Sequence, residues 1–344
     1  MSTISPFRAL RYDESVAGDL HDLVAPPYDV IDEPSREGYL ASSPYNIVHL
    51  TLPESEEAAG ATLADWRERG VMRLEEPALW WIAQEFTGPD DVDRVREGLA
   101  ASIEATPYAD GKVLPHELTH AGPKESRLRL LRATRTQLEP IFLLYDADPI
   151  AARPDGEPDI DVDEGGVRTQ VWRLPPDELN IDVPLLIADG HHRYETAVAF
   201  REEDPSATHT FAVLVSSRSP GVEIFPTHRI ARFLATEPDG FMTSSWDQSS
   251  LALYREGNFF RLDTDGDELD VQAVERFGPE GVTYTPYLDE AMAAVEEGEA
   301  DSAFLVRAPT IAQVAAFAAR GETMPQKSTY FFPKLTSGLL LYPL

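Results

Sequence analysis

The chain has 344 residues, which allows two or three subdomains around a sizeable hydrophobic core. It contains no cysteine, so disulfides, thiolate catalysis and cysteine-ligated zinc or iron–sulfur sites are excluded. The formal net charge of −31 opposes binding to the phosphate backbone of a nucleic acid, which requires a basic surface. We therefore expect a globular protein that has no nucleic acid as its partner.

The sequence also predicts where the protein works. No stretch approaches the roughly 18 to 20 apolar residues that cross a bilayer, and the first ten residues lack the regions of a signal peptide. We expect a cytoplasmic protein without a membrane partner. Asp and Glu number 60 against 29 Lys and Arg, a balance that resembles proteins of salt-loving organisms. Because salt screens the repulsion between like charges, we expect high salt to stabilise the fold.

Residues 1–100 are predicted to form a mixed α/β region. The loop at residues 26–29 contains two prolines and is either a rigid turn or part of the acceptor pocket. It is followed by a strand at 46–52, a helix over 56–74 and a strand at 78–86. The helix has apolar or small residues at the three-and-four spacing of an amphipathic helix, namely Ala59, Leu63, Trp66, Gly70 and Leu74.

Residues 101–235 contain the candidates for chemistry. Apolar runs predict strands at 140–145, 183–188 and 210–215, and the Asp-, Pro- and Gly-rich stretch 146–166 is typical of an acidic surface excursion.

The third region, residues 236–344, is again predicted to be α/β. Its patterns favour a strand at 258–262, a helix at 288–295, a strand at 303–307 and a helix at 311–320.

The sequence Asp-Gly-His-His-Arg breaks the strand at 183–188 and precedes a segment with helical composition. A turn between a strand and a helix directs backbone N–H groups and the positive end of the helix dipole at one point, which stabilises an anion. Gly190 permits close approach of the backbone, Arg193 can fork onto phosphate oxygens, and His191 or His192 can donate or shuttle a proton. The alternative is that the two histidines cap the helix or satisfy buried polar groups. We expect the turn to bind a phosphate.

The pattern H-E-x-x-H occurs at His116, Glu117 and His120. On a helix this spacing places two zinc ligands on one face, with the glutamate as the base for a metal-bound water. Pro115 precedes the pattern and residues 122–123 are Gly-Pro, so a helix here has only about two turns. The alternative is that Glu117 alone acts, as a general base.

Several of these motifs together resemble a known family. The whole chain resembles the family named domain of unknown function 1015, in the stretches 6–12, 25–31, 115–119, 188–197 and 324–334. The middle resembles the ParB and sulfiredoxin superfamily and, within it, the free-serine kinases. That likeness rests on Pro-His-Glu at 115–117, a strand beginning with Pro-Ile at 140–143, and Asp-Gly-His-His-Arg at 189–193.

The resemblance implies an α/β fold in which a ParB/sulfiredoxin-like core is flanked by N- and C-terminal α/β regions. It implies that Glu117 is the catalytic base and that Gly190, His191, His192 and Arg193 bind phosphates. ATP or ADP is then the donor, with Mg²⁺, and the acceptor is a small hydroxyl compound such as free L-serine. Sulfiredoxin activity is excluded because the chain has no cysteine.

The lysines support a phosphate site independently of any family. The chain has only four, and all lie in candidate-site segments: Lys112, Lys124, Lys327 and Lys334. Because lysine is a compact point charge suited to phosphate, we predict that Lys327 contacts the nucleotide, with Lys334 as a second candidate. The alternative is a chance grouping of the four lysines on surface turns.

We therefore predict a nucleotide-dependent small-molecule kinase that converts L-serine to O-phosphoserine. Glu117 and His192 are its predicted catalytic residues, and Asp189, a candidate Mg²⁺ ligand, completes the phosphate-binding turn. The alternatives are a zinc hydrolase that uses His116, Glu117 and His120, a nucleotide-binding module without turnover, and a ParB relative that processes nucleic acid, which the net charge disfavours. The sequence does not indicate an oligomeric state.

Overall fold

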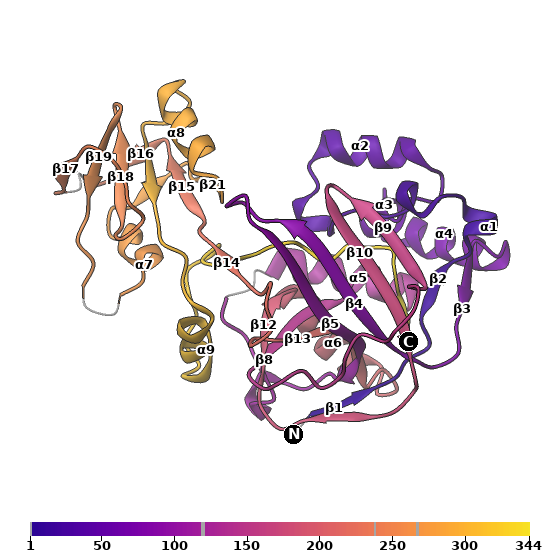
Figure 1. The fold of residues 1–344 in the computed structure, drawn as a ribbon. Helices are drawn as coiled ribbons and strands as arrows, with labels where there is room; N and C mark the ends of the chain where they lie inside the picture. The colour runs from indigo at the N-terminus through magenta and orange to yellow at the C-terminus, as the bar shows by residue number, and fades with distance from the viewer. Residues whose placement is uncertain (1, 118–120, 237–238, 266–267) are drawn as a thin grey trace. The chain divides into compact units, whose positions relative to one another are not determined.

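The computed structural model describes residues 2–117, 121–236, 239–265 and 268–344 (Figure 1). The chain forms two compact units: the first contains residues 1–115, 119–222 and 333–344, and the second contains residues 116–118 and 223–332. Helices and strands alternate in both, so the predicted α/β class is confirmed. The predicted regional boundaries near residues 100 and 235 stay a prediction. In the described part of the chain, no helix has both the length and the apolar character to cross a bilayer.

A ten-stranded sheet forms the centre of the first unit. Eight of its strands follow the order β6-β12-β8-β13-β5-β4-β10-β9, and β1 and β11 pair off this path. Their bounds are Val113–Leu114 (β6), Leu185–Asp189 (β12), Ile141–Tyr145 (β8), His209–Ser216 (β13), Asp93–Glu104 (β5), Leu79–Thr87 (β4), Val167–Leu174 (β10), Ile160–Glu164 (β9), Ser2–Ser5 (β1) and Leu179–Ile181 (β11). Strands β8, β12 and β13 are buried along nearly their whole length, which explains their unbroken apolar sequences.

Helices pack on this sheet and beside it. Helix α6 contacts β8 and β13, α5 packs on α6, and α4 packs on α5. The helices are Glu14–Ala17 (α1), Glu33–Ser42 (α2), Val48–Thr51 (α3), Glu56–Glu68 (α4), Ala121–Thr134 (α5) and His191–Glu203 (α6). Two small ladders pair Leu10–Tyr12 (β2) with Met72–Leu74 (β3), and Thr136–Gln137 (β7) with Tyr342–Pro343 (β24). Single 3-10 turns lie at Leu20–Asp22, Tyr28–Val30 and Tyr108–Asp110.

The predicted strand at 46–52 is wrong, because residues Val48–Thr51 form the short helix α3. The buried side chain of Asn46 explains the difference. Its Nδ2 donates to the carbonyl oxygens of Asp22 and Val24, and its Oδ1 accepts the N–H of Val48 at 2.9 Å. An asparagine that bonds to nearby backbone favours a turn over a strand, whatever the apolar residues that follow.

The helix predicted over 56–74 is confirmed in its first three turns, but it ends at Glu68. Gly70 has φ +72°, in the left-handed region that ends helices, and the chain then enters β3. The strands predicted at 78–86, 140–145, 183–188 and 210–215 are confirmed as β4, β8, β12 and β13.

The second unit contains a six-stranded sheet in the order β17-β19-β18-β22-β15-β21. These strands are Phe241–Thr243 (β17), Asn258–Arg261 (β19), Ala252–Arg255 (β18), Ser302–Leu305 (β22), His228–Ala231 (β15) and Thr283–Thr285 (β21). Its helices are Asp270–Glu275 (α7), Leu288–Glu296 (α8) and Ile311–Ala319 (α9), and two ladders pair Ile224–Phe225 (β14) with Tyr330–Phe331 (β23) and Phe233–Leu234 (β16) with Pro279–Glu280 (β20). The four elements predicted after residue 257 are confirmed as β19, α8, β22 and α9.

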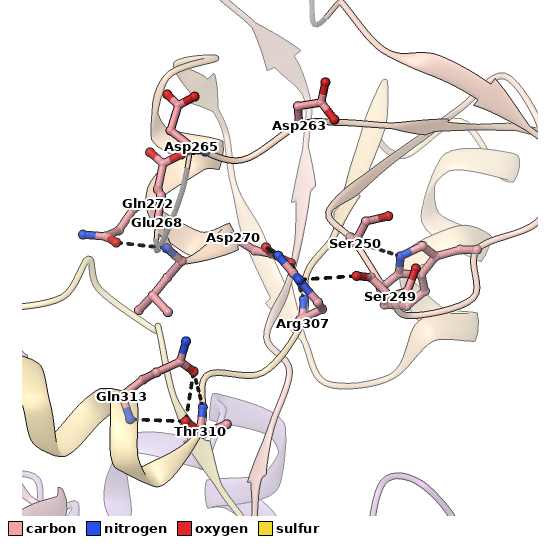
Figure 2. A network of polar contacts seen from close by, with 12 residues as sticks. Ser249, Ser250, Asp263, Asp265, Glu268, Asp270, Gln272, Arg307, Thr310 and Gln313 are labelled. Carbon is pink, nitrogen blue, oxygen red and sulfur yellow. Dashed lines mark hydrogen bonds and ion pairs between the residues drawn. The ribbon is translucent and has the colours of Figure 1, made fainter.

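An ion pair between the buried Asp270 and the exposed Arg307 connects α7 to the chain that follows β22 (Figure 2). The carboxylate of Asp270 accepts from the backbone N–H of Arg307 at 2.7 Å and from its guanidinium at 2.5 to 3.2 Å. Arg307 Nη1 also donates to the carbonyl oxygen of Ser249 at 3.3 Å. Because Arg307 donates both its backbone N–H and its guanidinium to Asp270, this pair fixes the start of the loop that leads into α9.

The buried side chain of His228, on β15, is expected to make the stability of the protein depend on pH. The ring is buried, its Nδ1 accepts the N–H of Val306 at 3.2 Å, and burial together with Arg229 lowers its pKa to about 4. His228 therefore binds a proton more readily in the unfolded chain than in the folded protein. The contribution of the neutral ring to stability is complete above the unfolded pKa near 6.5 and is lost as the pH falls towards 4. We expect the unfolding free energy of the protein to fall by about 3 kcal/mol more than that of His228→Gln between pH 7 and pH 4. Parallel pH profiles of the two proteins in urea would contradict this.

Candidate functional site

The predicted strand–turn–helix is confirmed, and Gly190 forms the turn between the strand and the helix. Strand β12 ends at Asp189, Gly190 has φ +93° and ψ +29°, and α6 begins directly after it at His191. A Cβ at this glycine would lie 3.1 Å from Nε and 3.2 Å from Cζ of Arg193. Position 190 therefore requires glycine both for its left-handed backbone and for the space that the guanidinium fills.

The carboxylate of Asp189 lies between two cations. Its Oδ1 accepts from Nζ of Lys334 and its Oδ2 from Nη2 of Arg193. The side chains of Asp189 and Arg193 are only 15 % and 11 % exposed. Burial alone would raise the pKa of Asp189, but Lys334 and Arg193 outweigh it and lower the pKa well below its usual range. The aspartate is therefore ionised, and the three side chains together carry one net positive charge.

Arg193 also connects β12 to the neighbouring strand β8. Its Nη1 donates to the carbonyl oxygen of Pro140, directly before β8, at 2.6 Å. Burial lowers the pKa of this guanidinium, but Asp189 and the more distant Glu139 reverse the effect and raise it. Two of its nitrogens thus donate to groups of the protein itself. The forked contact to phosphate that was predicted for Arg193 stays a prediction.

Lys334 is positioned through the backbone around it. Nη2 of Arg96 donates to the carbonyl oxygen of Pro333 at 2.6 Å, and Nε2 of Gln84 donates to that of Lys334 at 3.1 Å. Arg96 is itself buried, with its guanidinium 4.5 Å from the centre of the Phe142 ring, and burial lowers its pKa to about 9. Arg96 on β5 and Gln84 on β4 thus clamp the chain so that the ammonium of Lys334 reaches Asp189.

The first turn of α6 has a positive electrostatic character. It contains His191, His192 and Arg193 and no acidic residue, and the preceding Gly190 has no side chain that could cap the helix. His191 is buried and His192 is half-buried. The helix dipole adds partial positive charge at the same end, and such a helix terminus favours a negatively charged group.

In the second unit, the Pro-His-Glu segment lies beside the closing segment of the chain. Glu117 and Met324 form a parallel bridge, and the N–H of Met324 donates to the carbonyl oxygen of His116 at 2.8 Å. Oε1 of Glu117 accepts the N–H of Lys327 at 3.1 Å, and Nε2 of His116 lies 2.9 Å from Oγ1 of Thr329. Two motifs separated by about two hundred residues therefore form one structural element.

The structure describes only part of the H-E-x-x-H pattern, so the zinc alternative stays a prediction. Glu117 lies in a bridge with Met324. His120 lies outside the described residues. Lys327 is exposed and has φ +56°, and its predicted contact with a nucleotide stays a prediction.

The predicted site residues fall into two sets. Asp189, Gly190, His191, His192 and Arg193 come together with Lys334 in the first unit, whereas His116, Glu117 and Lys327 come together in the second. The closing segment contributes to both, because the chain passes from the second unit to the first between Phe332 and Pro333. Sequence reasoning missed Arg96, Gln84 and Glu139. Arg96 lies in the charged first half of β5, close to Asp93, Arg94 and Glu97, so its neighbours gave no signal that it is buried.

The residues present do not fit a dedicated Mg²⁺ site. Both carboxylate oxygens of Asp189 accept from cations, and across the described ranges no three His, Asp or Glu side chains form a group that could hold a metal ion. The predicted role of Asp189 as a Mg²⁺ ligand therefore has no support from its contacts.

Comparison with known proteins identifies the family. The chain belongs to the family described as "Protein of unknown function (DUF1015)", whose model matches residues 4–279. No curated protein matches the sequence significantly.

Three solved structures show a distant similarity. A free serine kinase in complex with AMP is 17 % identical with a TM-score of 0.44, covering 70 % of this chain and 91 % of that one. A conserved hypothetical protein from Pyrococcus furiosus is 17 % identical with a TM-score of 0.42, covering 71 % and 95 %. SbnI from Staphylococcus aureus, with a C-terminal truncation, is 10 % identical with a TM-score of 0.44, covering 70 % and 86 %.

Removal of the charge on Asp189 is expected to destabilise the first unit. Asp189→Asn leaves the buried cations of Arg193 and Lys334 without their anion, which costs about 3 kcal/mol of unfolding free energy. The matched control is Asp161→Asn, which breaks a half-exposed pair with Arg168 at 2.6 Å and costs at most about 1 kcal/mol. Denaturant unfolding measures both changes, and equal losses in the two variants would contradict the central role of Asp189.

Proposed function

We propose that this DUF1015 protein is a nucleotide-dependent phosphotransferase that acts on a small hydroxyl compound, and that the turn from Asp189 to Arg193 binds the phosphates of ATP or ADP. The observation that carries the proposal is the N-terminus of α6, which begins directly after Gly190. It lies beside the side chains of Asp189, Arg193 and Lys334, a triad that carries one net positive charge. In a chain with a net charge of −31, this local positive charge selects for an anion.

The helix N-terminus and the triad each offer one kind of contact to a phosphate. The helix N-terminus supplies backbone N–H groups, which bind without the cost of ordering a flexible side chain. Lys334 supplies a point charge that its backbone clamp holds near the turn. In phosphoryl transfer most catalysis is positioning and neutralisation of charge, and these contacts supply both.

We infer that the acceptor is free L-serine and that Glu117 is the base. The motifs at residues 115–117 and 189–193, which resemble those of the free-serine kinases, support this assignment. The serine hydroxyl oxygen attacks the terminal phosphorus of the nucleotide, the bond to the leaving phosphate breaks, and Glu117 accepts the hydroxyl proton. The products are O-phosphoserine and a nucleotide shortened by one phosphate. The proposal gives His192 the role of a proton donor or shuttle within the turn.

The test of this function is the formation of O-phosphoserine by the purified protein. The reaction contains high salt, Mg²⁺, L-serine and either ATP or ADP. We expect product with one of the donors, and a loss of about a hundredfold or more in Glu117→Gln, because the variant keeps the shape of the side chain but removes the base. Glu322→Gln, which neutralises an exposed glutamate paired with Arg320 in the same unit, is the control and should retain the activity.

Each other outcome has a definite meaning. Full activity in Glu117→Gln would contradict its role as the base. Nucleotide binding without consumption would favour the non-catalytic module, and no nucleotide binding at all would overturn the proposed function.

The role of the turn predicts a selective effect of Gly190→Ala on nucleotide affinity. The new Cβ both strains the left-handed backbone and displaces the guanidinium of Arg193. Gly111→Ala is the matched control, because Gly111 also has a positive φ, +68°, but a Cβ there meets nothing within 4 Å. Both variants lose about 1 kcal/mol of stability to backbone strain, and only Gly190→Ala should lose affinity for ADP in calorimetry. Unchanged affinity in Gly190→Ala would show that the turn does not bind the nucleotide.

A further inference from the structure

A cavity with mostly apolar walls lies beside the proposed phosphate site, within the first unit. The centre of a water-sized sphere can occupy about 50 Å³ of it, and its walls also contain charged side chains. Leu130 and Leu131 of α5 and Ile141 of β8 form the apolar part, while Arg127 of α5 and Arg193 of α6 belong to the charged part. A mixed wall of this kind is typical of sites for small polar ligands.

Two threonine hydroxyls in this wall lack a hydrogen bond. Thr51 and Thr196 are 1 % and 4 % exposed, and among the described residues neither Oγ1 has a partner. Thr210 lines the same cavity but donates its hydroxyl to Oε1 of Gln137 at 2.9 Å. A buried hydroxyl without a partner costs about 1 to 3 kcal/mol, and both of these threonines border the cavity, so a ligand that bonded to them would recover this cost.

The charge of the wall favours an anionic group on that ligand. The guanidinium of Arg127 lies 4.1 Å from the centre of the Tyr28 ring and donates to the carbonyl oxygen of Thr51 at 2.9 Å, and within the described ranges it forms no ion pair. The other arginine of the wall, Arg193, has a counter-ion, because it forms an ion pair with Asp189.

The one acid among the residues that line the cavity, Glu139, has partners of its own. Its Oε1 accepts from the N–H of Tyr28 at 3.0 Å and from the hydroxyl of Ser337 at 2.8 Å. Burial raises the pKa of Glu139, while Arg193 and the Ser337 hydroxyl act in the opposite direction. Among the described residues, the wall therefore presents hydrogen-bonding groups and the guanidinium of Arg127, which forms no ion pair with Glu139.

We propose that this cavity binds the acceptor as a small hydroxy-carboxylate, with Arg127 holding the carboxylate and Thr51 and Thr196 bonding to its polar groups. The inference rests on the proposed function, because Arg193 belongs both to the cavity wall and to the phosphate-binding turn. An acceptor in the cavity would therefore lie against Arg193, which also belongs to the turn proposed to bind the nucleotide. The class includes L-serine and glycerate, and glycerol falls outside it because it has no carboxylate.

Calorimetry without nucleotide tests the cavity apart from catalysis. L-Serine and D-glycerate are titrated into the full-length protein, with glycerol as the uncharged comparison. We expect both carboxylates to bind and glycerol not to bind. Thr196→Val and Thr51→Val should each weaken binding about tenfold without lowering the stability, because each hydroxyl that is removed has no partner in the protein.

The chain offers a matched control for these variants. Thr227, in the second unit, also has a buried Oγ1 without a partner in the described part of the chain, and it does not line the cavity. Thr227→Val should therefore leave the affinity unchanged. Arg127→Gln should abolish binding of both carboxylates, and Arg127→Lys, which keeps the positive charge, should restore part of it.

The outcomes separate this proposal from the proposed function. If neither carboxylate binds, or if both threonine variants bind like the unchanged protein, the cavity proposal is overturned. Phosphoserine formation with an unchanged KM for serine in Thr196→Val would also overturn it while leaving the function intact. Carboxylate binding that depends on Thr196 and Arg127, in a protein that forms no phosphoserine, would support the cavity and contradict the kinase.

Discussion

The ion pairs of Asp189 are the interaction on which the architecture of the site depends. A buried carboxylate is tolerated only where cations and hydrogen bonds compensate the loss of water. Here Arg193, four residues further along the chain, supplies one cation and Lys334, near the C-terminus, supplies the other. The same contacts join the end of β12, the start of α6 and the closing segment, so the geometry of the turn and the position of the last residues are fixed together.

Under the proposed function, this arrangement accounts for an anion site in a very acidic protein. The triad carries one net positive charge, and it lies at the positive end of a thirteen-residue helix whose first turn has no acid. Electrostatic forces between exposed groups are screened within roughly 10 Å at moderate salt, so the field at the turn depends on these near groups more than on the net charge of −31. The clamp formed by Arg96 and Gln84 matters because it keeps Lys334 within that range.

The sequence predicts the local parts of this account but not the long-range ones. The apolar run before Asp189, followed by glycine and a helix-favouring segment, was sufficient for strand, turn and helix, because each of these depends on neighbouring residues. The pairing of Lys334 with Asp189, 145 positions away, depends on tertiary contacts that no spacing encodes. The same limit explains the mistaken strand at 46–52, where apolar periodicity was overridden by the hydrogen bonds of Asn46 to a loop more than twenty residues earlier.

The central claim is that the turn from Asp189 to Arg193 binds the phosphates of a nucleotide. The most direct measurement is the change in the backbone amide resonances of this turn during titration with ADP in high salt. The account predicts that the resonances of residues 190–193 shift together and saturate, because their N–H groups lie at the helix terminus that receives the phosphate, while the resonance of Gly111 stays in place. Saturable shifts elsewhere with none in the turn, or no shift at all, would contradict it.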